Sequence, residues 1–268
     1  MVLYATGFNA WNQLQFESPG VDEPDDIASC TCVLREDSVD RIRPFFSYTR
    51  VHDGRHSLNQ YPSISSLLSQ DSPSHTFSSP PHITQLVVYE TGFAALSSAG
   101  QVWTWGDERY TACLGREPTD DSPAATPGPV TDLDELPTGP ITKLAAGGYI
   151  LAALTAGKDL YCWGHAGRSP LTLDNLSDAP SPVVIDDKDI LDVAIGEAHM
   201  LVLTADRAVY VLGANTNGQL GLPGVSSAKT WARIDLDAVL GKGEIVTGVA
   251  AGPRNSFLMV HKQPEECQ

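Results

Sequence analysis

One pattern of residues occurs three times in this chain, and it constrains the fold more than any other feature. Each copy has a short apolar stretch that ends at Tyr89, Gly147 or Gly196, and a second glycine follows 17 residues later. These closing glycines are Gly106, Gly164 and Gly213, which are spaced 58 and 49 residues apart. A repeat of about 50 residues built from short antiparallel strands is typical of a β-propeller blade.

The third copy shows the elements of a blade most clearly. Leu201–Thr204 and Val209–Leu212 have the length and the β-branched and aromatic content of strands, and a polar turn lies between them. The segment Gly213–Gly221 follows and contains an Asn-Gly pair, which is a strong turn signal. The chain has 23 glycines and 19 prolines, an abundance of turn formers that agrees with many short strands.

The two ends of the chain carry complementary halves of the pattern. Residues 249–260 match its first half, and residues 3–14 match its second half without a first. A blade assembled from both ends would close a ring and leave no long sheet edge exposed. The sequence therefore predicts an all-β propeller closed by pairing of its N- and C-terminal strands, as one domain over residues 1–268, with clear repeats at 86–260 and 2–15.

Residues 16–85 do not show the pattern clearly. Ile27–Leu34, with Cys30 and Cys32 on one strand face, and Pro44–Val51 could be strands of a divergent blade. Residues 63–81 hold eight serines and three prolines, a composition that favours a flexible loop. Counting this region, we expect five to six blades of four strands, and at most seven.

The charge balance restricts the partners. The chain has 17 Lys and Arg against 33 Asp and Glu, for a net charge of −16. Nucleic acids and acidic lipids both require basic side chains, so neither is expected to bind. Residues 117–140 contain six acidic and no basic residues, and 174–192 adds six Asp against one Lys. A protein partner with a basic surface fits this composition, although acidity can equally serve solubility alone.

Three observations bear on the cellular location. No apolar run approaches the ~20 residues of a membrane span. The N-terminal residues lack the basic start and the long apolar stretch of a signal peptide. The cysteines number five, which is odd and suggests no disulfide framework. We therefore expect a cytoplasmic or nuclear protein that is not secreted.

Motifs of catalysis and metal binding are absent from the sequence. It has no nucleophile elbow, no phosphate-binding loop, no dinucleotide fingerprint and no H-E-x-x-H. The spacing of Cys30 and Cys32 places both thiols on one face of a strand, whereas zinc sites usually need C-x-x-C with a second pair. Counting Ser, His and Asp cannot exclude a triad, but nothing indicates one. The expectation is no enzyme, no cofactor and no metal.

The third copy resembles the repeat of the regulator of chromosome condensation family. The matching segments are 193–204, with its pattern Val-Ala-x-Gly-x-x-His-x-Leu-x-Leu-Thr, then Val209-Tyr210 and the turn at 213–221. The resemblance implies a propeller, usually of seven blades, so this ring is shorter or irregular. The founding member of the family is a nuclear exchange factor for the small GTPase Ran and binds chromatin.

Several positions differ from those of the functionally described members. The founder is rich in His three residues after the repeat glycine, but Gly92, Ile150 and Asn255 stand there and only His199 remains. A plant ultraviolet photoreceptor of the family uses Trp directly after that glycine. This chain has other residues at those positions: Glu90, Gly148, Glu197 and Pro253. The chain looks most like small accessory members, such as a partner of a histone-tail-processing dioxygenase or a fungal factor in tRNA wobble and diphthamide modification.

Two sets of residues are singled out by the pattern. Residues that hold the scaffold together, through turns, close backbone approach or packing between blades, are expected to be Gly7, Gly106, Gly147, Gly164, Gly196, Gly213, Gly218, Gly252, Tyr4, Trp103, Tyr161 and Tyr210. The short loop after each repeat glycine varies from copy to copy, as a binding face does and as drift also does. Its candidate partner-binding residues are Glu90, Tyr149, Glu197, His199, Arg254 and Asn255.

The sequence thus predicts a monomeric, non-enzymatic scaffold or accessory subunit for protein–protein interaction, with a partner that has a basic surface. One alternative is a guanine-nucleotide exchange factor for a Ran-type small GTPase, which the charge and the missing histidines disfavour. Another is an accessory factor in tRNA or diphthamide modification or in chromatin regulation.

Overall fold

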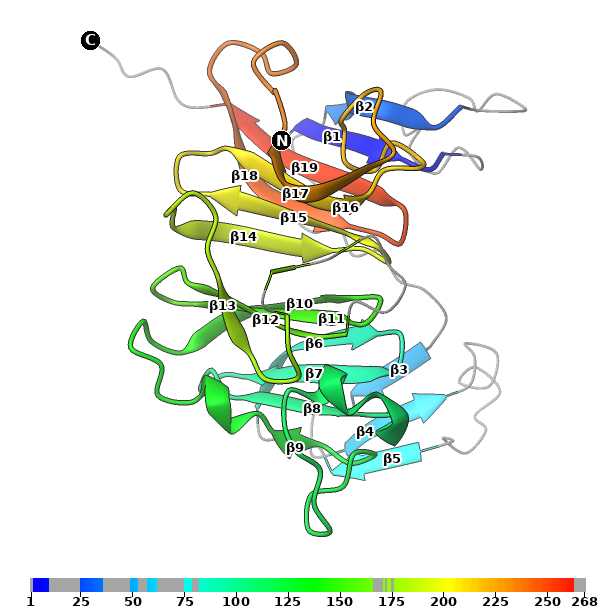
Figure 1. Ribbon diagram of the computed structural model, residues 1–268, viewed down its shortest axis with the longest axis vertical. Helices are drawn as coiled ribbons and strands as arrows, with labels where there is room; N and C mark the ends of the chain where they lie inside the picture. The colour runs from blue at the N-terminus through cyan, green and yellow to red at the C-terminus, as the bar shows by residue number, and fades with distance from the viewer. Residues whose placement is uncertain are drawn as a thin grey trace.

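The computed structural model describes residues 2–9, 25–35, 49–52, 57–61, 75–78, 82–165, 171, 173–174 and 176–262. The strands in these residues form five antiparallel sheets, four with four strands and one with three. Two short 3-10 helices, Glu108–Leu114 and Thr131–Leu133, lie in connections. The predicted all-β propeller is confirmed, and four of the sheets are its four-stranded blades (Figure 1).

The four-stranded sheets are numbered here as blades 1 to 4. Blade 1 contains β6 (Ile83–Tyr89), β7 (Gly92–Ser97), β8 (Val102–Gly106) and β9 (Gly128–Pro129). Blade 2 contains β10 (Ile141–Gly147), β11 (Ile150–Thr155), β12 (Leu160–Gly164) and β13 (Ser181–Val183). Blade 3 contains β14 (Ile190–Ile195), β15 (His199–Thr204), β16 (Val209–Ala214) and β17 (Ser227–Arg233). Blade 4 contains β18 (Glu244–Ala251), β19 (Asn255–Lys262), β1 (Val2–Gly7) and β2 (Ile27–Arg35).

Blade 4 is assembled from both ends of the chain, as the split repeat predicts. β1 lies between β19 and β2, and its pairing with β19 runs without interruption from Val2↔Val260 to Gly7↔Asn255 (Figure 1). Because β1 is paired on both sides, the N-terminal strand is an inner strand of its sheet and leaves no free edge.

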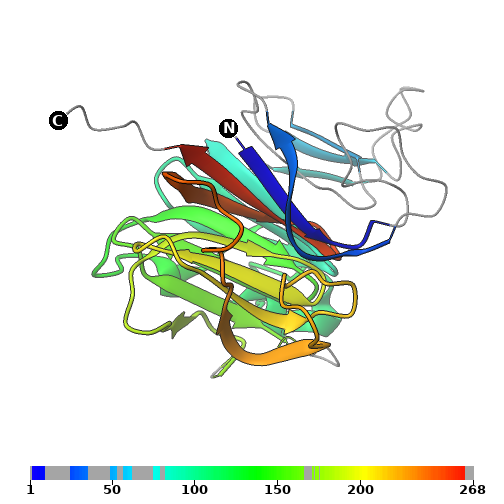
Figure 2. The same cartoon turned by 90° about the horizontal axis from the view of Figure 1, so that it is seen from above.

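The blades pack face to face, and their contacts form the core. In Figure 1 they follow one another along the molecule from blade 1 to blade 4, and Figure 2 shows the row curving round. Each large hydrophobic cluster combines residues of two successive blades: Leu144 with Leu96, Val202 with Leu160, and Leu201 with Leu258. The stability of each blade therefore depends on its neighbours.

The divergent region is partly described. The predicted strand at 27–34 is confirmed as β2, and residues 49–51 of the second predicted strand lie in β3 (Thr49–His52). β3 joins β4 (Ser57–Tyr61) and β5 (His75–Ser78) in the three-stranded sheet. The prediction of a flexible loop over 63–81 is wrong at β5, where Thr76 and Phe77 are residue types that favour strands. The rest of that loop and residues 44–48 lie outside the described residues.

Every blade has the same irregularity near the start of its first strand. One residue of β6, β10, β14 and β18 is skipped in the pairing with the second strand, at Thr84, Thr142, Leu191 and Thr247. In three blades this residue is Thr, and its hydroxyl donates to a carbonyl of the second strand at 3.1 to 3.2 Å. A bulge of this kind re-aims the side chain that follows it.

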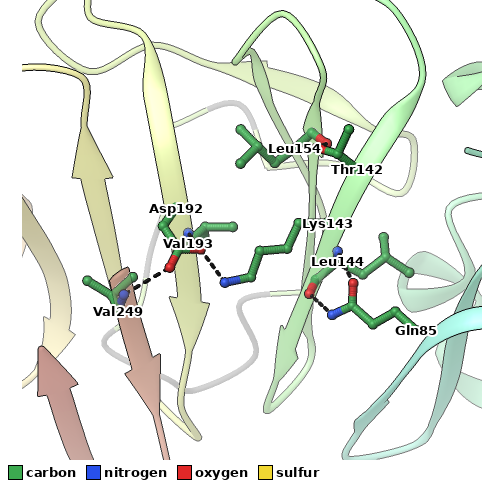
Figure 3. Close-up of polar contacts among 8 residues, drawn as sticks. All are labelled: Gln85, Thr142, Lys143, Leu144, Leu154, Asp192, Val193 and Val249. Atoms are coloured by element: carbon green, nitrogen blue, oxygen red, sulfur yellow. Dashed lines mark hydrogen bonds and ion pairs between the residues drawn. The ribbon is translucent and has the colours of Figure 1, made fainter. Parts of the chain in front are cut away.

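The re-aimed side chains connect the first strands of successive blades (Figure 3). Gln85 pairs with the backbone of Leu144 through both ends of its amide, at 2.6 and 2.9 Å. Lys143 forms an ion pair with Asp192, whose other carboxylate oxygen accepts from Val249 N at 2.9 Å. Polar contacts thus run from blade 1 to blade 4 through the first strands.

His199 is a buried polar group at the contact between blades 3 and 4. Its Nε2 lies 2.9 Å from Ser256 Oγ, which itself donates to the carbonyl of Gln219 at 2.7 Å. Because the hydroxyl has a single proton, the imidazole Nε2 carries the ring proton and donates to Ser256. A Cβ at Gly196 would lie 2.1 Å from His199 Cε1, so the glycine makes room for the ring.

Three of the four aromatic residues pack between blades as predicted. Tyr4 and Tyr210 are buried in the clusters between blades 3 and 4 and between blades 2 and 3, and Tyr161 packs against the cluster between blades 1 and 2. Trp103 differs from this prediction, because it packs against Trp105 and its neighbours within blade 1. The Tyr4 hydroxyl also donates to Glu244 at 3.1 Å.

We expect Asp192→Ala to lower the free energy of unfolding by about 1–3 kcal/mol, because it leaves the Lys143 ammonium and the Val249 N–H without their acceptor. Asp192→Asn keeps an oxygen for Val249 and should cost less than Asp192→Ala. Urea unfolding measures both values. The exposed Asp178→Ala is the control, and an equal loss in that variant would contradict the prediction.

Burial lowers the pKa of His199 to about 4, from an ordinary value near 6.5. At a pH between these two values, the imidazole is therefore protonated in the unfolded chain but neutral in the folded protein. The stability contributed by neutral His199 is lost as the pH falls from about 7 toward 4. Urea unfolding across this range should show a weaker pH dependence for His199→Gln than for the native chain. The exposed His261→Gln should keep the native dependence.

Candidate functional site

Four of the six candidate partner-binding residues lie in the turns that join the first and second strands of the blades. These turns, called the inner turns, are residues 90–91, 148–149, 196–198 and 252–254. The side chains of Glu90, Glu197 and Arg254 are exposed, and that of Tyr149 is half-buried. The structure therefore brings four of the six predicted residues to turns at the same end of successive blades.

Backbone contacts between blades hold the inner turns close together. Glu90 N donates to the carbonyl of Gly148 at 2.8 Å, and Glu197 N donates to that of Pro253 at 3.1 Å. Between blades 2 and 3, a Cβ at Gly147 would lie 2.2 Å from the carbonyl oxygen of Gly196. The turns pack backbone against backbone here, which only glycine permits.

Within each blade, the closing glycine anchors the inner turn. The residue after it donates its N–H to a carbonyl of that turn, as Ala214 does to Ala198 at 2.7 Å. Gly213 has a φ of 108°, and a Cβ on it would lie 2.3 Å from the same carbonyl oxygen. The equivalent bonds in the other blades are Asp107 to Thr91, His165 to Tyr149 and Phe8 to Arg254.

The exposed charges of the inner turns are mainly acidic. Glu197 pairs with Arg254, with 3.3 Å between the carboxylate and the guanidinium. Both side chains are more than half exposed, so solvent screens this pair and it contributes little to stability. Glu90 remains as an exposed carboxylate next to the Tyr149 turn, to which its backbone is bonded.

An aromatic pair borders these charges, and sequence reasoning missed half of it. Tyr110 lies in the 3-10 helix between β8 and β9 of blade 1, and it stacks on Tyr149 with ring centroids 5.3 Å apart. Asp107 caps that helix, and its hydrogen bonds with Arg109 lower the pKa of the carboxyl to about 2. The Arg109 guanidinium in turn lies 5.9 Å from the Tyr110 ring centre. The signal in the sequence was the departure of residues 107–115 from the turn seen at 214–221.

Two candidate residues occupy other positions than expected. His199 is fully buried, so its side chain does not reach the surface and the prediction that it contacts a partner is corrected. Its ring instead packs against Gly196 of an inner turn and is hydrogen-bonded to Ser256. Asn255 begins β19 opposite Gly7 and is half-buried.

In blade 1 the large and the small residue of the Gly196–His199 contact have changed places. Tyr89 stands where blade 3 has Gly196, and Gly92 stands where blade 3 has His199. A Cβ at Gly92 would lie 2.5 Å from the Tyr89 hydroxyl oxygen, so the tyrosine fills the space that the imidazole fills in blade 3. The missing histidine of blade 1 is therefore compensated by packing, and its loss says nothing about binding.

The described residues contain no group of three or more His, Cys, Asp or Glu that could hold a metal ion. Cys30 is buried and Cys32 half-buried, both as free thiols. Burial raises the pKa of Cys30 to about 12, which favours the unreactive thiol. No helix in the described part of the chain is long and apolar enough to cross a membrane.

Comparison with known proteins agrees with the repeat. Residues 190–219 match the model of the regulator of chromosome condensation (RCC1) repeat. The chain is 29% identical to the mitochondrial RCC1 domain-containing protein RUG3 of Arabidopsis thaliana, over 63% of this chain and 38% of that protein. It is 34% identical to the human regulator of chromosome condensation, over 47% of this chain and 30% of that protein. These alignments span less than half of either relative.

Solved structures show the same fold. Yeast RCC1 (Prp20), in its complex with Kap60, superposes with a TM-score of 0.64 at 16% identity, over 88% of this chain and 57% of that one. Human WBSCR16 superposes with a TM-score of 0.56 at 16% identity, over 97% of this chain and 81% of that one. The predicted resemblance is thereby confirmed: the chain carries a regulator of chromosome condensation repeat and is an RCC1-like β-propeller.

Proposed function

We propose that this protein is a non-enzymatic interaction scaffold that binds a protein partner with a basic surface through its inner turns. The observation that carries the proposal is the position of Glu90, Glu197 and Tyr149, which successive blades place at one end of the propeller. Backbone bonds between blades fix these turns, so little conformational entropy is lost when a partner binds.

The chemistry of these turns suits basic side chains. Exposed carboxylates attract Lys and Arg at long range and pair with them at contact. The stacked rings of Tyr110 and Tyr149 offer a face to a cation, and Arg109 already lies near one of them. The net charge of −16 adds a general attraction for basic proteins.

A second candidate is nucleotide exchange on a Ran-type GTPase. The observation in its favour is the fold shared with yeast RCC1 (Prp20), whose reported binding properties concern Gsp1p and histones. The histones are a basic class of partner, which agrees with the acidic inner turns as well.

We expect the double variant Glu90→Lys and Glu197→Lys to bind purified core histones about tenfold more weakly than the native chain at low salt, because two attractive charges become repulsive. Biolayer interferometry at several salt concentrations measures the dissociation constants. The control is Asp134→Lys with Glu135→Lys, an equal change of charge that lies at the other end of blade 1. Equal weakening by both double variants would mean that net charge alone drives binding, against the proposal.

The scaffold proposal also predicts that the full chain leaves GDP release from purified Ran at its intrinsic rate. Release of a fluorescent GDP analogue, followed by stopped flow, measures this directly. Acceleration that grows with the concentration of the chain would establish the exchange factor and refute the scaffold as its sole activity. Intact circular dichroism of the same sample is the control for folding.

A further inference from the structure

A groove opens on the outer side of the molecule, between the last strands of blades 2 and 3. It has a volume of about 290 Å³. β13 supplies one wall and β17 the other, and each is the edge strand of its blade. The residues that line it include Asp174, Val183, Val184, Leu212, Lys229 and Trp231.

The groove exists because β17 departs from its neighbour. Val211 of β16 pairs with Ala232, whereas Gly213, two residues later, pairs with Ala228. The segment between these two β17 residues is therefore longer than the matching segment of β16, and it bulges away. Leu212 of β16 lies at this point and forms a buried part of the groove wall.

The walls of the groove present apolar surface to solvent. Val184 is 68% exposed, more than Tyr110 at 36% and Val225 at 48%, the other exposed large hydrophobic residues in the described part of the chain. Val183 and Trp231 are half-buried and pack against the core below. A half-exposed Trp beside an exposed Val forms an apolar anchor site of the kind that binds a side chain of a partner.

The groove itself is lined by one acidic and one basic residue, and the segments of chain on either side of β13 add exposed aspartates. Asp174 lines the groove, and Asp178, Asp186 and Asp187 are exposed within a few residues of β13 along the chain. Lys229 is the basic residue among those that line it. A second copy of this chain, with its net charge of −16, would be repelled by these aspartates. A basic segment of a different protein would be attracted.

We propose that this groove binds a short extended segment of another protein, in which an apolar side chain is flanked by Lys or Arg. The apolar side chain lies between Val184 and Trp231, and the basic side chains face the aspartates. The segment runs along the edge strand β13, where extended peptides can add to a sheet. This site shares no residue with the inner turns, and the proposal does not depend on the function proposed for them.

The test uses the full chain and a short fluorescein-labelled peptide in which Lys alternates with Val and Leu. Two matched peptides replace Lys by Glu, or Val and Leu by Ser. Fluorescence anisotropy should detect binding of the first peptide only. Val184→Lys should weaken it about tenfold, because it removes apolar contact and adds a like charge. Val225→Lys, the same change at another exposed valine, should alter the dissociation constant by less than about twofold.

Several results would overturn the proposal. Absence of binding by the first peptide would do so, as would equal binding of the serine peptide or equal weakening by Val184→Lys and Val225→Lys. Self-association of the chain in sedimentation velocity, abolished by Val184→Lys, would assign the groove to a second copy instead. The double variant Glu90→Lys and Glu197→Lys should bind the peptide like the native chain, and this separates the groove from the inner turns.

Discussion

The close approach of the first strands of successive blades is the constraint on which the rest of this propeller depends. At Gly147 the backbone of blade 2 lies so near that of blade 3 that a single added carbon would overlap a carbonyl oxygen. Side chains cannot fill such a contact, so backbone amides and carbonyls must satisfy one another across it. These contacts hold the inner turns against one another, and their exposed side chains project from them.

The bulges direct side chains of the first strands toward the next blade. The polar side chains that follow the bulges of blades 1 to 3 reach the next blade, and each is of a different type: an amide at Gln85, an ammonium at Lys143 and a carboxylate at Asp192. In blade 4 the equivalent position after the bulge is Gly248, where a Cβ would approach the Asp192 carboxylate. Each blade is therefore joined to its own neighbour by a different polar contact.

The repeat in the sequence predicted the blades and the pairing of the two termini, because strand periodicity and closing glycines are local signals. The sequence could not show that His199 is buried. It is the first residue of β15, directly after an inner turn, and whether its side chain faces solvent or the core depends on where the neighbouring blade lies. The stack of Tyr110 on Tyr149 joins residues of two blades, and the groove at β13 depends on a bulge in β17. Such contacts arise from tertiary packing, which no single segment encodes.

Pairing of β1 with β19 has a consequence for the order of events during synthesis. β1 leaves the ribosome long before β19, so the pairing that begins at Val2↔Val260 can form only after β19 has been synthesised. Bringing such distant segments together costs loop-closure entropy that only the finished interface repays. Blade 4 is therefore complete only after β19 has been made, and a product that stops before β19 would leave β1 without this partner strand.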